Sequence, residues 1–143
     1  PMPEYHESMK GVLLQGKRAL PDSSCLVIGA MDRAVKRGEE LLSIRVLPFL
    51  IEEQRKVAAE VGCGFFDTYT AMGGRGSMAT WVRRGLGQAD LTHPTAVGSD
   101  VIGTWIFRAL MQRYSAFLAR SSGAAGATSG PKTDSATSSP SRR

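Results

Sequence analysis

The sequence predicts an α/β fold built on a parallel sheet, and three observations support this class. Two short apolar runs, residues 24–29 and 64–67, are typical of strands that are buried on both faces of a sheet. Segments with apolar residues at helical spacing separate and flank these runs. Because alternating helices and strands build layered α/β folds, we expect the two strands to lie parallel in one sheet.

Two helices and a loop accompany the first strand. Residues 4–17 carry apolar side chains at helical spacing, and the Pro-Asp pair at 21–22 ends this helix. Residues 31–40 are polar and charged, so we expect a loop with at most one helical turn. Pro48 suits the first position of a second helix, which Gly62 is expected to end.

The last part of the folded region contains a glycine-rich loop and two helices. Residues 72–78 lack the Gly-Lys-Ser/Thr ending of a phosphate-binding loop. Ser77 is predicted to cap a short helix that contains Trp81. Thr95 is predicted to cap a long helix that runs to about Ala119.

Composition divides the chain into two regions. Residues 1–119 are expected to form part of one domain, and residues 120–143 a disordered basic tail. From residue 121 onward there is no Leu, Ile, Val or aromatic residue, so the tail cannot bury enough apolar surface to offset its ordering entropy. The net charge is +5, but the basic residues of the tail are sparse, and we expect no nucleic-acid partner. No apolar run reaches transmembrane length and no signal peptide is visible, so we expect no membrane span.

The chain has two cysteines and two histidines, which lack metal-ligand spacing. We therefore expect neither a metal site nor a cofactor. Cys25 opens an apolar run, so a buried free thiol is the expected state. The alternative is a disulfide between Cys25 and Cys63, which requires adjacent strand starts and an oxidising compartment.

The segment Asp90-Leu91-Thr92-His93 carries the candidate chemistry. It places a carboxylate three residues before an imidazole, on a non-helical turn ahead of the last helix. Hydrolases use such a carboxylate to orient a histidine that acts as general base. The alternatives are that His93 is a structural or surface histidine and that Asp90 caps a turn through its own backbone. Ser77 is a poor nucleophile candidate, because no tight strand-to-helix turn precedes it.

The order of these elements resembles the carboxy-terminal half of the SGNH (GDSL-type) esterase family, over roughly residues 5–117. Residues 24–33 are similar to that family's fourth strand and the loop after it, and residues 64–67 to its fifth strand. Asp90 and His93 match its Asp-x-x-His block, and the segment from Gly74 onward resembles bacterial O-acetylesterases of peptidoglycan or polysaccharide. The resemblance implies a flavodoxin-like, three-layer α/β/α fold.

The resemblance also implies a serine esterase that deacylates a saccharide or a small acyl ester. His93 would move the proton of the serine and Asp90 would orient His93. The family carries its nucleophile in a Gly-Asp-Ser block after its first strand, and this block is absent here. The asparagine of the family's oxyanion hole is absent too, because the chain contains no asparagine. We therefore expect this chain alone to be inactive, with the amino-terminal half of the same domain as its partner. The alternative is a non-catalytic remnant or binding module. The family implies an extracytoplasmic location, periplasmic or secreted.

Overall fold

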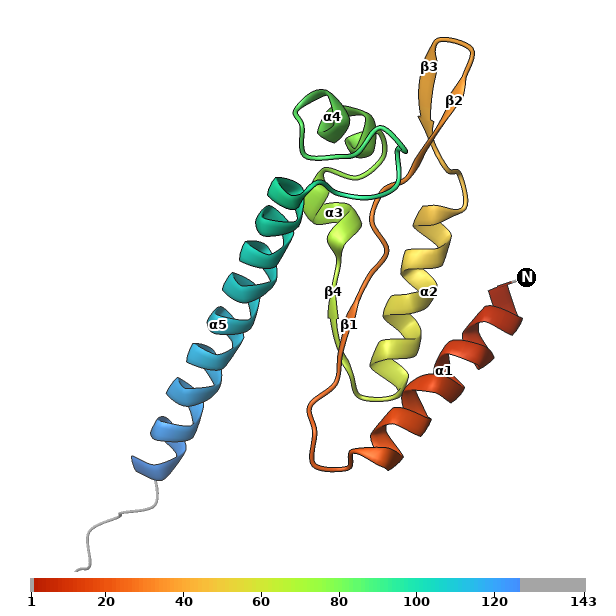
Figure 1. Ribbon diagram of the computed structural model, residues 1–143. Helices are drawn as coiled ribbons and strands as arrows, with labels where there is room; N and C mark the ends of the chain where they lie inside the picture. Colours follow the sequence, from red (N-terminus) through yellow and green to blue (C-terminus); the bar gives the residue numbers. More distant parts are fainter. Residues whose placement is uncertain (1, 127–143) are drawn as a thin grey trace, which may run out of the picture. The chain divides into compact units, whose positions relative to one another are not determined.

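The computed structural model describes residues 2–126 (Figure 1). The chain divides after Phe107 into two compact units, and the last helix passes from the first unit into the second. All other elements belong to the first unit, which combines helices with a parallel pair of strands and an antiparallel hairpin. None of the described helices is long and apolar enough to cross a membrane.

The two predicted amino-terminal helices are present. Helix α1 spans Met2–Ala19 and helix α2 spans Leu47–Glu60, with proline in the first turn of α2. Gly62 follows the end of α2 with a φ of 69°, a left-handed conformation that glycine adopts without steric cost. Helix α1 packs on α2, and α2 packs on the parallel strands, as Figure 1 shows.

Strands β1 (Leu26–Ile28) and β4 (Gly64–Phe66) pair in parallel, which confirms the predicted parallel sheet. The register sets Leu26 opposite Gly64 and Ile28 opposite Phe66. Helix α2 lies between the two strands in sequence and packs against both of them. This is the βαβ connection that parallel pairing requires.

The prediction of a free thiol at Cys25 was wrong, because Cys25 forms a disulfide with Cys63. Each cysteine directly precedes one strand of the parallel pair, so the register of Leu26 opposite Gly64 brings them together. Their Cα atoms lie 4.7 Å apart, within the range that a disulfide spans. The disulfide fastens the start of β1 to the start of β4.

The prediction of a loop for residues 31–40 was also wrong. Strands β2 (Ala34–Arg37) and β3 (Glu40–Ser43) form an antiparallel hairpin there, with Arg37 opposite Glu40. Gly38, with a φ of 60°, occupies the first position of the two-residue turn, as a type II′ turn requires. The hairpin escaped prediction because only Ala34 of β2 is buried, so the charged side chains dominate the local sequence pattern.

Two short helices follow β4. Helix α3 (Thr68–Met72), which the sequence pattern did not reveal, is capped by Asp67, whose carboxylate accepts the N–H of Thr70. Helix α4 (Ser77–Arg83) contains Trp81 as expected. The predicted Ser77 cap was wrong, because α4 has glycine at its N-cap position and no side-chain cap of its own.

The last helix, α5, spans Ala96–Gly126. Its predicted cap is confirmed, because the hydroxyl of Thr95 accepts the N–H of Gly98 at 3.2 Å. The helix extends past the expected end near Ala119, through a stretch that contains further alanines, the best helix formers. Residues 127–143 of the predicted tail lie outside the described residues.

A hydrophobic core gathers residues of the hairpin, α3, α4 and the start of α5. Its buried residues are Ala34, Met72, Met78 and Trp81. Trp105 of α5 meets Trp81 edge to face, with ring centroids 5.8 Å apart. Leu91 packs against the same cluster, so this core anchors the loop that carries Asp90 and His93.

Candidate active site

The loop between α4 and α5 is closed by its own backbone. Gly87 and Pro94 form an antiparallel bridge across its base. Inside the bridge, the N–H of Gln88 donates to the carbonyl of His93 at 2.8 Å. The chain between these points is therefore a short, tied turn, with Asp90 near its tip.

Leu91 adopts a conformation that side chains rarely take. Its φ is 60°, and among residues 2–126 no other residue except glycine has a positive φ. The left-handed conformation costs about 1–2 kcal/mol for a residue with a Cβ. Two hydrogen bonds hold Leu91 in place, from its N–H to Gln88 (3.1 Å) and from the N–H of Ala34 to its carbonyl (3.0 Å). Strained residues of this kind cluster at functional sites.

Asp90 and His93 are in direct contact at this turn. The Nδ1 atom of His93 lies 2.7 Å from Oδ2 of Asp90, in position to donate its proton. The other carboxylate oxygen, Oδ1, accepts the backbone N–H groups of Thr92 (2.9 Å) and His93 (3.0 Å). Asp90 therefore caps the turn and orients the imidazole at the same time, so the two roles are not alternatives.

These hydrogen bonds favour the ionised carboxylate. The contact with the His93 ring, followed by the backbone N–H groups of His93 and Thr92, lowers the pKa of Asp90 to about 2. Asp90 is therefore negatively charged at all physiological pH values. The ionised carboxylate therefore stays available to accept the proton of His93 Nδ1, which fixes the orientation of the ring.

The second ring nitrogen of His93, Nε2, makes no hydrogen bond to any of residues 2–126. The side chain is 66% exposed, so Nε2 is accessible. No described hydroxyl is in position to give it a proton. The Ser77 hydroxyl is buried and has no hydrogen-bond partner among the described residues, so the structure does not join it to His93. Among residues 2–126, the arrangement therefore pairs an exposed imidazole with the carboxylate that orients it, and no hydroxyl is bonded to the ring.

Asp32, which follows β1, supports the loop region and was not identified as important from the sequence. Its side chain is fully buried, and Oδ2 accepts the hydroxyl of Ser43 (2.9 Å) and the N–H of Met78 (2.9 Å). The Ser43 hydroxyl in turn accepts the N–H of Gly76 at 2.7 Å. Asp32 thus caps α4 from outside the helix and ties it to the hairpin. A carboxylate in the segment that follows a predicted strand was the one signal that the sequence offered.

The other histidine, His6, has a different setting. It lies between two carboxylates of α2, with Nδ1 2.6 Å from Glu53 and Nε2 3.2 Å from Glu60. The hydrogen bond with Glu53 is the main cause that raises the pKa of His6 above its ordinary value, and Glu60 adds to it. Both ring nitrogens are engaged, so His6 fastens α1 to α2. No group of His, Cys, Asp and Glu in the described part of the chain could hold a metal ion.

Neither the protein-family models nor the curated proteins give a match to this sequence. The structure is similar to a solved structure of a peptidoglycan O-acetylesterase, with a TM-score of 0.75 and 23% sequence identity. The similarity covers 81% of this chain and 33% of that protein, so this chain spans about a third of its length. The chain therefore has the α/β fold of one part of an O-acetylesterase.

Proposed function

We propose that this chain is the carboxy-terminal part of an SGNH-type esterase domain, with the flavodoxin-like three-layer arrangement. The domain would remove acyl groups from an esterified saccharide, and Asp90 and His93 would be its acid–base pair. One observation carries the proposal: Oδ2 of Asp90 lies 2.7 Å from Nδ1 of His93, while Nε2 is exposed and makes no described contact. The serine and the oxyanion donors would come from a polypeptide segment outside these 143 residues.

In this proposal each atom of the pair has one task. His93 Nε2 takes the proton of the attacking serine and then delivers it to the leaving alcohol. Asp90 keeps the proton of the ring on Nδ1, which leaves Nε2 as the acceptor, and stabilises the imidazolium that forms. The capped turn fixes the ring relative to the core through Leu91, so little reorganisation is needed when the serine segment is in place.

The unpaired edge of β1 supports the proposal that a segment from outside these residues completes the domain. The carbonyl of Cys25 accepts the N–H of Gly64, and the N–H of Gly29 donates to Phe66, both at 2.8 Å. Because alternate residues of a strand direct their backbone groups to opposite edges, those of Leu26 and Ile28 point away from β4. No strand within residues 2–126 pairs with that edge. An unpaired parallel edge is suited to a further strand.

The side chains of β1 support the same conclusion. Leu26 is 40% exposed and Ile28 is 54% exposed, although strands of a parallel sheet are normally covered on both faces. A sheet of two parallel strands is also far below the usual size. Additional strands with a covering helix, as in a three-layer domain, would bury these residues.

The substrate class and the compartment rest on two further observations. The similar solved structure is that of an enzyme that removes O-acetyl groups from peptidoglycan, so an acetylated saccharide is the first substrate to test. The disulfide between Cys25 and Cys63 fits an oxidising compartment, as in periplasmic and secreted proteins. We therefore propose an extracytoplasmic esterase.

The test is acetate release from O-acetylated peptidoglycan fragments. The 143-residue chain is assayed alone and after co-expression with the part of the similar O-acetylesterase that it does not match, with assembly checked by gel filtration. We expect no His93-dependent release from the chain alone. The assembled pair should release acetate, and His93→Ala should lower the rate about 10²–10⁴-fold. His6→Gln, which removes the imidazole that fastens α1, is the control and should keep the rate.

Two results would overturn the proposal. An assembled, active pair that tolerates His93→Ala would remove the catalytic role of the dyad. A His93-dependent release by the chain alone would show that a nucleophile lies within these residues. The alternative, a non-catalytic binding module, is favoured by the absence of any described hydroxyl bonded to His93. It predicts saccharide binding without acetate release in every combination.

A further inference from the structure

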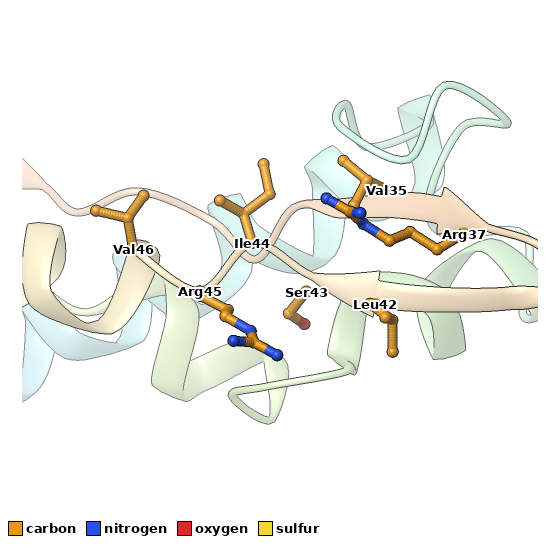
Figure 2. A pocket seen from close by; sticks show the side chains of 7 residues that line it. All are labelled: Val35, Arg37, Leu42, Ser43, Ile44, Arg45 and Val46. Atoms are coloured by element: carbon orange, nitrogen blue, oxygen red, sulfur yellow. The ribbon is translucent and has the colours of Figure 1, made fainter.

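The hairpin β2–β3 carries a pocket that is made of different residues from the Asp90–His93 site. Its volume is about 660 Å³, which is within the range of small-molecule sites. Figure 2 shows it from close by. The residues that line it come from β2, β3 and the segment that leads into α2: Val35, Arg37, Leu42, Ser43, Ile44, Arg45 and Val46.

Two arginines give the pocket its charge. In Figure 2 the guanidinium group of Arg37 lies along β2 beside Val35, and that of Arg45 extends from the segment before α2 on the side of Ser43. Neither guanidinium forms an ion pair or a hydrogen bond with any of the described residues. A guanidinium presents several donors in a planar fork that matches a carboxylate or a phosphate. Two such groups without a protein partner at one pocket offer charged donors to an anionic ligand.

The remaining lining is apolar and accessible. Val35 and Leu42 are cross-strand partners in the hairpin, and their side chains are 38% and 44% exposed. Val46 is 46% exposed. A cluster of exposed apolar side chains beside cations is suited to a ligand that has both an apolar body and a negative charge.

We propose that this pocket binds a small ligand with an anionic oxyacid group, a carboxylate or a phosphate, attached to an apolar body. Arg37 and Arg45 bind the anion, and Val35, Leu42 and Val46 contact the apolar body. Glu40 lies opposite Arg37 in the register and forms no ion pair in the described part of the chain. Its negative charge repels the anion and weakens binding. The proposal does not depend on the esterase function.

The first experiment compares matched probes in an NMR titration of the 143-residue chain. N-acetyl-leucine carries a carboxylate on a branched apolar body, and N-acetyl-leucinamide has the same body without the charge. We expect the acid to shift the Nε–H signals of Arg37 and Arg45 and to bind at least tenfold more tightly than the amide. Isopentyl phosphate, compared with isopentanol, forms the second arm. The tighter of the two anions identifies the oxyacid. Equal binding of each anion and its neutral analogue would overturn the proposal.

The second experiment removes single charges from the hairpin. Arg37→Gln and Arg45→Gln should each weaken binding of the tighter anion about tenfold, because a hydrogen bond to a charged group is lost. Lys36→Gln removes the same charge from the next position of β2, whose side chain does not line the pocket, and should leave binding unchanged. Glu40→Gln should tighten binding. If Lys36→Gln weakens binding as much as Arg37→Gln, only the overall charge attracts the anion and no site exists. These side chains are exposed, so each variant should keep its fold.

Discussion

One carboxylate holds both the ring and the backbone of the same histidine. Oδ2 of Asp90 lies 2.7 Å from the ring Nδ1 of His93, and Oδ1 accepts the N–H of His93 at 3.0 Å. The position of the imidazole is therefore coupled to the conformation of the turn. This double contact explains why a motif with only two residues between carboxylate and histidine is sufficient to orient the ring.

Asp90 should resist protonation to unusually low pH. Its pKa in the folded chain is about 2, below the ordinary value of 3.8. The stabilisation from the ionised carboxylate is therefore fully present above pH 3.8 and is lost as the pH falls through 2. A titration of the Asp90 carboxyl carbon by NMR should show this low midpoint. His93→Ala removes the largest cause and should raise the midpoint toward the ordinary value, whereas an unchanged midpoint in that variant would contradict the contact.

Gly98 should be irreplaceable even by alanine. A Cβ at this position would lie 2.0 Å from the carbonyl oxygen of Leu86. That oxygen already accepts the N–H of Thr95, at the base of the loop that carries Asp90 and His93. Gly98→Ala should destabilise the chain by about 1–3 kcal/mol, the usual cost of overpacking. It should also shift the NMR signals of the loop that carries Asp90 and His93.

Gly103→Ala is the matched control in the same helix. A Cβ at Gly103 meets nothing within 4 Å, so the change should stabilise the chain by about 0.5–1 kcal/mol through helix propensity. Urea denaturation of the two variants gives both values. The NMR signals of the loop that carries Asp90 and His93 provide a second comparison, because Gly103→Ala should leave them unchanged. A neutral Gly98→Ala would contradict the close approach of α5 and Leu86.

The sequence was sufficient to predict the elements whose signals are local. Apolar spacing and capping residues predicted α1, α2, the two parallel strands and the start of α5 at Thr95. The hairpin was missed, because only Ala34 of β2 faces the core and the rest of the strand is exposed. Helix α4 was placed correctly, but its cap was not, since the capping carboxylate of Asp32 comes from 46 residues away.

In the candidate site, too, the local features were predictable from the sequence and the features that depend on tertiary contacts were not. Asp90 and His93 are three residues apart, so a local motif was enough to pair them, and the structure brings them together. The left-handed conformation of Leu91 depends on the bond to Ala34 and on packing against the core, neither of which is visible in the local sequence. The disulfide of Cys25 likewise depends on strand register. The catalytic role of the pair remains a prediction.

The contact between α1 and α2 should depend on pH through His6. Its pKa is raised in the folded chain above 6.5, so its contribution to stability is fully present below pH 6.5 and is lost as the pH rises through the higher folded value. His6→Ala should therefore lower the melting temperature more at pH 6 than at pH 9. Glu53→Gln removes the main partner and should reduce this pH-dependent difference. A loss that is the same at both pH values would show that His6 acts by packing alone.

The disulfide should be the largest single contributor to the stability of the β1–β4 pair. Cys25 and Cys63 are 38 residues apart, and closing a loop of this length restricts the unfolded chain by about 4 kcal/mol. Urea denaturation should show a loss of about 2–4 kcal/mol in Cys25→Ser/Cys63→Ser or on reduction of the native chain. Reductant should have no further effect on the double variant, which separates loss of the disulfide from other effects of the reagent. A native chain that shows two free thiols after unfolding without reductant would contradict the disulfide. It would also remove the argument for an oxidising compartment, because no other feature of the described chain requires one.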